Sequence, residues 1–186
     1  MISQYKAELI FKDIWGFLLI VAIIAQIRFR GKHKQSGGLI ARLQVVAPYL
    51  VVFGWFSVRV YFGTYKANVI AQLLGLAIML IGVSGYIAAI LYLKQNWAIS
   101  AAIKEGHSLV KAGPYKMVRH PMYFFMILVV LGSGLLISNY FIILYTPIVT
   151  FLYYLRSKKE EEMLKVALPE YEEYIKDTKM LIPFIF

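Results

Sequence analysis

Long apolar runs separated by short charged segments dominate this chain. A helix needs about 20 apolar residues, at 1.5 Å each, to cross a bilayer. The runs 43–62 and 70–93 are long enough, and a shorter run at 11–27 predicts either a further span or a shallow, tilted helix. The pattern therefore indicates a membrane protein. Gly75, Gly82 and Gly85 predict that neighbouring helices approach the run 70–93 closely.

The run 122–155 carries no charge and is too long for one span. As a single helix it would measure about 50 Å, against about 30 Å for the hydrocarbon core. Ser138 and Asn139, near its middle, favour a turn. We expect two antiparallel helices there, the second bent or wedged at Pro147. The predicted fold is all-α: a polytopic transmembrane helical bundle of about five spans, the last two a helical hairpin, in a single membrane domain over 1–186.

Basic residues set the predicted orientation of this bundle. They concentrate in the segments 28–42 and 94–121 and in the C-terminal tail, whereas the alternate loops hold only Lys66. By the positive-inside rule these three basic segments face the cytoplasm and the N-terminus lies outside. Arg59 is either a functional charge within the run 43–62 or a side chain that reaches the interface.

Composition narrows the class of protein further. Of 186 residues, 60% are hydrophobic, against about 45–50% in soluble domains. The net charge is +10, and the basic residues lie between the apolar runs. This distribution suits loops at an anionic lipid surface better than a nucleic-acid groove, so no nucleic-acid partner is expected. The absence of Cys excludes disulfides, thiolate metal sites and a Cys nucleophile. His33, His107 and His120 lack the spacing of metal ligands, so no metal site is expected.

The first candidate site lies in the predicted cytoplasmic segment 94–121. Pro121 suits the first position of a helix, because its missing N–H has no partner there in any case. Arg119 and His120 would then stand at a helix N-terminus, which suits a carboxylate or phosphate ligand. The alternative is that Arg119 extends to the lipid interface and His120 is only a turn residue.

The second candidate site follows the last apolar run. Arg156 and Glu160 are spaced i and i+4, so a helix would bring them close enough to pair. The alternative is a solvated helix on which Lys and Glu merely balance. Farther on, the acidic aromatic patch 171–174 is expected to be an interfacial anchor rather than a site.

An ordered series of motifs covers 94–183, about half of the chain. The series is N-W, H-x-L-V-x-x-G-P-Y, V-R-H-P-x-Y, an apolar hairpin, R-x-x-x-E-E-x-x-L and Y-x-x-Y. In this order and spacing it resembles the isoprenylcysteine carboxyl methyltransferases and the related phospholipid methyltransferases. The resemblance implies a cytoplasmic pocket for S-adenosylmethionine, roofed by C-terminal helices, and a lipophilic substrate that enters from the bilayer.

The same resemblance implies roles for individual residues. It places Arg156 and Glu161 at the family's essential Arg and Glu, Arg156 as a clamp on an acceptor acid and Glu161 as a partner of the cofactor's ammonium or of Arg156. With Arg119 at the predicted helix N-terminus, the expected cofactor-binding residues are His107, Leu109, Val110, Tyr115, Arg119, His120, Pro121, Tyr123 and Glu160. Phe124 and Phe125 depart from the family pattern, which often has a small residue there, and Pro169 stands where Gly is usual.

Several functions are compatible with these motifs. The leading interpretation is carboxyl methylation of an isoprenylcysteine-like acceptor, since an Arg can hold a carboxylate bidentately. A phospholipid amine or a small thiol are alternative acceptors. An NADPH-dependent reductase of the sterol type and a non-enzymatic lipid-binding membrane protein are the alternatives from other classes.

Overall fold

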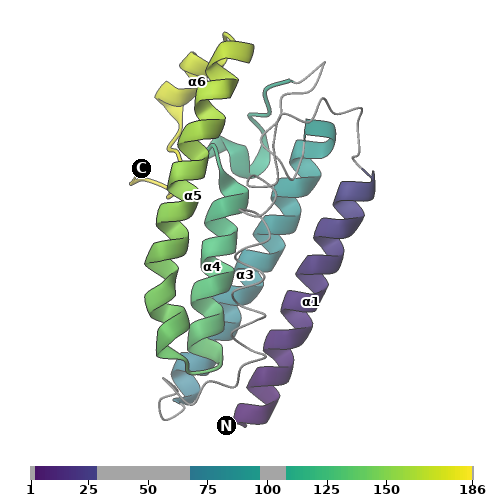
Figure 1. Ribbon diagram of the computed structural model, residues 1–186, viewed down its shortest axis with the longest axis vertical. Helices are drawn as coiled ribbons and strands as arrows, with labels where there is room; N and C mark the ends of the chain where they lie inside the picture. Colours follow the sequence, from purple (N-terminus) through teal and green to yellow (C-terminus); the bar gives the residue numbers. More distant parts are fainter. Residues whose placement is uncertain (1–2, 29–67, 97–107, 186) are drawn as a thin grey trace.

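The computed structural model describes residues 3–28, 68–96 and 108–185, and these residues form helices (Figure 1). In chain order the elements are α1 (Gln4–Arg28), α3 (Val69–Leu93), η1 (Lys94–Asn96), η2 (Gly113–Lys116), α4 (Pro121–Leu136), α5 (Tyr140–Ala167) and α6 (Tyr171–Asp177). Within the described residues the only extended pairing is an isolated parallel bridge between Val118 and Lys179. The predicted all-α class is confirmed. The run 43–62 and Arg59 lie outside the described residues.

Small residues bring α3 and α4 into close contact. A Cβ added to Gly75 would lie 2.5 Å from the backbone nitrogen of Leu136. One added to Gly132 would lie 2.6 Å from the carbonyl oxygen of Gly75. Because no side chain separates the two backbones here, the helices approach as glycine-containing membrane helices do. The close approach expected at Gly75 is confirmed.

A short turn divides the long uncharged run between α4 and α5. Ser138 adopts a positive φ of 54°, and the side chain of Asn139 accepts hydrogen bonds from the backbone N–H groups of Phe141 and Ile142. This cap satisfies two of the unpaired donors at the start of α5. The chain reverses at this turn, so α5 runs antiparallel to α4 and continues through Pro147 (Figure 1).

A buried hydrogen bond attaches α1 to the bundle. The indole nitrogen of Trp15 donates to the hydroxyl of Ser133 over 3.0 Å, and that hydroxyl donates to the carbonyl oxygen of Val129 over 2.6 Å. Trp15 is fully buried, so an indole N–H without a partner would be costly there. The bond therefore fixes the position of α1 along the axis of α4.

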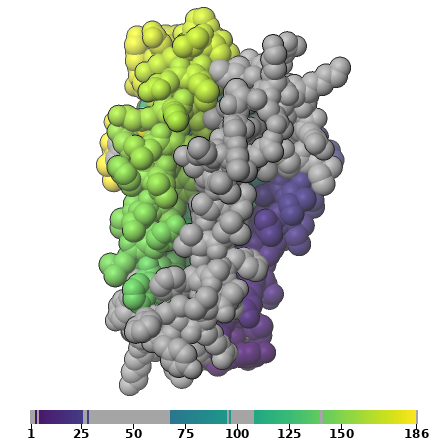
Figure 2. Space-filling model, in the orientation of Figure 1, coloured from purple at the N-terminus to yellow at the C-terminus, as the bar shows by residue number. Residues whose placement is uncertain are grey.

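The polar segments that follow or precede the helices lie at one end of the molecule. Figure 1 shows the C-terminal ends of α1, α3 and α5, the start of α4, and α6 together at the end opposite the N-terminus. In Figure 2 the described residues of α5 and α6 form a continuous surface along one edge up to this end. The candidate residues of both sites lie in these segments, so the bundle brings the two sites together.

The described helices differ in their suitability for crossing a membrane. Judged by length and composition, α3 is the one described helix that is long and apolar enough, and α4 is equally apolar but has 16 residues. In α5, 28 residues correspond to about 42 Å, so its charged last turns extend beyond its apolar part. The number of five spans stays a prediction.

Candidate active site

The C-terminal segment pairs with the residues that precede α4. The backbone N–H of Arg119 donates to the carbonyl of Lys179 over 2.8 Å, and that of His120 donates to the carbonyl of Met180 over 3.0 Å. The backbone N–H of Lys179 returns a bond of 3.4 Å to Met117. This short pairing holds the start of α4 against the chain that follows α6.

Arg119 is a buried connector at this end of the molecule. Its Nε donates to Glu161 Oε1 over 2.6 Å, and both side chains are 7% exposed. Its Nη1 also donates to the carbonyl oxygens of Ile175, over 3.3 Å, and Thr178. The alternative in which Arg119 extends to the lipid interface is therefore wrong, because its guanidinium ties α5 to the end of α6.

His120 lies between two carboxylates. It occupies the N-cap position of α4 but makes no capping bond with its side chain. Its Nδ1 lies 3.5 Å from Glu160 Oε2, and its Nε2 lies 3.4 Å from Glu161 Oε1. Burial by itself lowers the pKa of His120, but hydrogen bonds and charge from the two carboxylates raise that pKa above its ordinary value overall.

The two glutamates show the reciprocal effect. Burial by itself raises the pKa of each carboxyl, whereas His120 beside both, Arg156 beside Glu160, and Arg119 beside Glu161 lower them overall. Both carboxylates therefore remain ionised at neutral pH. The arrangement alternates buried positive and negative groups, which is the way in which proteins hold charges away from water.

Arg156, Tyr123 and Glu160 form the second half of the cluster. The Nε of Arg156 lies 3.0 Å from Glu160 Oε1 and donates to the hydroxyl of Tyr123 over 2.6 Å, while that hydroxyl donates to Glu160 Oε1 over 2.6 Å. The side chains of Arg156 and Glu160 are 8% and 18% exposed. The predicted i, i+4 pair is confirmed, and the solvated-helix alternative is wrong for these residues.

Of the two glutamates considered as partners of Arg156, the one at the i+4 position makes the contact. Glu160 makes the contact, while Glu161, one residue later, points to Arg119 and His120. Adjacent residues on a helix point about 100° apart. The two neighbouring glutamates therefore contact different partners.

The other sequence-predicted positions are distributed around this cluster. Tyr115 is buried, and its carbonyl accepts a 2.5 Å hydrogen bond from the hydroxyl of Tyr174. Leu109 packs against the buried cluster of Leu168, Tyr171 and Tyr174, Val110 is partly buried, and Pro121 begins α4 as predicted. His107 lies outside the described residues.

The patch 171–174 corrects one expectation. Tyr171 and Tyr174 are 2% and 4% exposed, and their rings meet edge to face with centroids 5.8 Å apart. The interpretation of this patch as an interfacial anchor is therefore wrong for the two tyrosines. Their burial against Leu109 and Leu164 joins α6 to the candidate site.

Among the described residues, two buried hydroxyls at this end have no hydrogen-bond partner, those of Ser157 and Tyr171. Burial raises the pKa of Tyr171, and the nearby Glu161 raises it further. Our sequence analysis missed Ser157, although it stands one helical turn before Glu161. Buried unpaired polar groups are rare and costly, so this set indicates a place for a polar ligand. In the described residues no group of three His, Asp or Glu side chains has the arrangement of a metal site.

The described residues form a helical bundle with a buried cluster of charged side chains at one end. A family model described as the isoprenylcysteine carboxyl methyltransferase (ICMT) family matches residues 73–166, half of the chain. The chain belongs to this family and is a membrane methyltransferase.

A solved structure supports the fold assignment. It is titled as the eukaryotic intramembrane Ras methyltransferase ICMT (isoprenylcysteine carboxyl methyltransferase) without a monobody. The likeness has a TM-score of 0.70 at 18% sequence identity and covers 98% of this chain and 68% of that one. At this identity the likeness establishes the shared fold. No curated protein matches the sequence.

Proposed function

We propose that this protein uses S-adenosylmethionine to methylate the carboxylate of an isoprenylcysteine-like, lipophilic acceptor at the cytoplasmic surface of the membrane. The observation that carries the proposal is the buried set of Arg156, Tyr123 and Glu160. The hydroxyl and the carboxylate both lie at the Nε of Arg156, so they fix the plane of the guanidinium. A pre-oriented guanidinium is the side chain best suited to hold a carboxylate in one geometry.

The polar groups around this set fit S-adenosylmethionine. That cofactor carries a sulfonium, an ammonium, a carboxylate and ribose hydroxyls. The hydroxyls of Ser157 and Tyr171, which lack partners among the described residues, offer hydrogen bonds to such a molecule, and the ionised Glu160 and Glu161 suit its positive charges. The proposed cofactor-binding residues are His107, Leu109, Val110, Tyr115, Arg119, His120, Pro121, Tyr123 and Glu160. Within this set, Arg119 acts through Glu161 by holding it in place.

The proposed reaction makes modest chemical demands on the protein. When bound, S-adenosylmethionine supplies a methyl group on a positively charged sulfur, and transfer to a carboxylate neutralises opposite charges. No side chain therefore has to remove a proton from the acceptor. What remains is to position the carboxylate and to exclude water, and aligned geometry can contribute up to about 7–11 kcal/mol. Arg156 would position the carboxylate, and Glu161 would hold the cofactor's ammonium.

The same residues bear on the choice of acceptor. A phospholipid amine is a cation near neutral pH, so a guanidinium would repel it, and a thiol has no oxygen atoms for a bidentate contact. Arg156 therefore favours a carboxylate over these alternatives. Membership in a methyltransferase family argues against the reductase and the non-enzymatic lipid-binding protein. The apolar part of the acceptor would remain in the bilayer beside the bundle.

A titration with S-adenosylhomocysteine tests the cofactor assignment. The purified protein in detergent should give binding heat and a raised melting temperature with S-adenosylhomocysteine and neither signal with NADPH. Ser157→Ala should weaken this binding, whereas Ser84→Ala, which removes a hydroxyl satisfied by its own helix on α3, should not. Binding of NADPH without binding of S-adenosylhomocysteine would contradict the proposal.

A further inference from the structure

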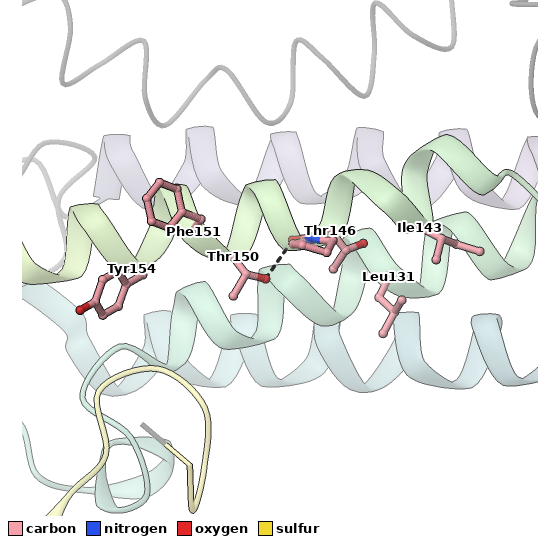
Figure 3. A pocket seen from close by; sticks show the side chains of 7 residues that line it. Leu131, Ile143, Thr146, Thr150, Phe151 and Tyr154 are labelled. Atoms are coloured by element: carbon pink, nitrogen blue, oxygen red, sulfur yellow. Dashed lines mark hydrogen bonds between the residues drawn. The ribbon is translucent and has the colours of Figure 1, made fainter.

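An open hollow of about 430 Å³ lies on the outer side of α5, where it meets α4. Leu131 of α4 and Ile143, Pro147, Phe151 and Tyr154 of α5 line it. Figure 3 shows Ile143 and Leu131 at one end and Tyr154 at the other, the end nearer the charged last turns of α5. The two threonines in its wall donate to carbonyls of their own helix, so the hollow presents an apolar lining. It has the volume of a typical small-molecule site.

The hollow faces away from the candidate active site. Residues 143, 147, 151, 154 and 158 follow one another at intervals of three or four and therefore share one face of α5. Arg156 and Glu160 lie two residues from Lys158 in either direction, which places them about 160° around the helix. A molecule in the hollow is therefore not the acceptor bound at Arg156.

Two charges continue the same face beyond the hollow. The Nζ of Lys158 lies 5.2 Å from the centroid of the Tyr154 ring, so the ammonium stands at the mouth of the hollow. Glu162 follows one turn later, about 6 Å farther along the axis. Both side chains are exposed. Along α5 the order is thus an apolar hollow, a cation and then an anion.

We propose that this face of α5 binds a phospholipid with a primary amine in its headgroup, such as phosphatidylethanolamine. One acyl chain occupies the hollow, the phosphate pairs with Lys158, and the ammonium, which is the outer group of the headgroup, pairs with Glu162. The order of the three contacts along α5 matches the order of the three groups along the lipid. The lipid is a bound partner here and is not methylated, since the site at Arg156 lies on the other side of the helix. The proposal does not depend on the identity of the methyl acceptor.

Native mass spectrometry of the full chain in detergent, without any methyl donor, tests this site. Dioleoyl phosphatidylethanolamine should bind at least about threefold more tightly than dioleoyl phosphatidylcholine or dioleoyl phosphatidylglycerol. Glu162→Gln should abolish the preference for phosphatidylethanolamine, because an exposed ammonium–carboxylate pair changes an affinity by about this threefold factor. Lys158→Gln should weaken all three phospholipids about fivefold, which corresponds to about 1 kcal/mol per cation at a lipid surface. Inorganic phosphate alone should not bind, because it has no chain to fill the hollow.

Matched variants separate this site from general lipid adhesion. Lys176→Gln and Glu173→Gln on α6 remove the same charges at exposed positions away from the hollow and should leave all affinities unchanged. Thr150→Phe should fill the hollow and weaken every phospholipid, whereas Leu144→Phe, at a 69% exposed position outside the lining, should not. Equal binding of the three lipids, or wild-type affinities in both Lys158→Gln and Glu162→Gln, would overturn the proposal. Binding of S-adenosylhomocysteine, measured in parallel, should be the same in all these variants, so failure of the lipid site is distinguishable from failure of the proposed function.

Discussion

The Nε of Arg119 lies 2.6 Å from Oε1 of Glu161, across 42 positions of sequence, and both side chains are almost fully buried. The same guanidinium reaches the carbonyls of Ile175 and Thr178, and the backbone of Arg119 pairs with Lys179. One residue therefore joins the start of α4 to α5 and to the C-terminal segment. These contacts fix the position of the C-terminal segment beside His120.

Replacing Arg119 should lower the thermal stability of the folded protein. Arg119→Ala leaves Glu161 buried without its partner, and removal of one member of a buried ion pair costs about 3–5 kcal/mol. The melting temperature of the purified protein should therefore fall clearly. Arg28→Ala, at an exposed position at the end of α1, is the matched control and should leave the melting temperature unchanged. Equal melting temperatures for both variants would contradict the role given to Arg119.

The contact between α3 and α4 predicts an unusual cost for a small substitution. In Gly75→Ala the new Cβ would lie 2.5 Å from the backbone nitrogen of Leu136, so the helices must move apart. In Gly16→Ala, on α1, no described atom lies within 4 Å of the new Cβ, and the change should stabilise the helix by up to about 1 kcal/mol. The melting temperature should thus fall in Gly75→Ala and rise in Gly16→Ala. A stabilising Gly75→Ala would refute the close approach.

The environment of His120 predicts a pH dependence of stability. Its pKa is raised in the folded protein, so the protonated imidazole stabilises the fold below the unfolded pKa of about 6.5, and this contribution is lost as the pH rises through the folded pKa. The pKa values of Glu160 and Glu161 are lowered, so their contribution is lost instead as the pH falls through their folded values. The melting temperature should fall from pH 6 to pH 9 in the wild type and much less in His120→Gln. An equal fall in both proteins would exclude the pairing of His120 with the carboxylates.

The hydroxyl of Tyr123 should act on the reaction, whereas the ring of Tyr123 is the part expected to serve the proposed cofactor site. Tyr123→Phe keeps the ring that stacks on Tyr153, with centroids 4.7 Å apart, but removes the hydroxyl that holds Arg156 and Glu160. The guanidinium then has more freedom, so methyl transfer should slow at least about tenfold while the affinity for S-adenosylhomocysteine changes less than about twofold. Tyr5→Phe, at a 67% exposed position, controls for loss of a hydroxyl. A Tyr123→Phe enzyme with wild-type turnover would show that the hydroxyl does not position Arg156.

The local features of this fold were predictable from the sequence, because each depends on neighbours in the chain. Pro121 has the fixed φ that suits a first helical position, and Asn139 caps the helix that follows it. Arg156 and Glu160 share a helix face through their spacing alone. These predictions needed no knowledge of how the helices pack.

The long-range features were not predictable in the same way. Hydrophobic periodicity shows which face of a helix is apolar but not which helix covers it, so the pairing of Arg119 with Glu161 has no signal in either segment. Tyr171 was misinterpreted for the same reason: an acidic aromatic helix resembles an interfacial anchor until Leu109 and Leu164 are found packed against it. The hydroxyl of Ser157 was missed because its lack of a partner is a property of the folded protein alone.

Transfer of a radiolabelled methyl group from S-adenosylmethionine to a farnesylcysteine mimic is the measurement that tests the central claim most directly. The wild-type protein should produce a labelled product from which base releases the label as methanol, as expected of a methyl ester. Arg156→Lys keeps the charge but loses the planar fork, so its rate should fall by an order of magnitude or more while S-adenosylhomocysteine binds as before. Lys159→Arg, at an exposed position on the same helix, should match the wild type. A base-stable product, or turnover by Arg156→Lys within about twofold of wild type, would contradict the account.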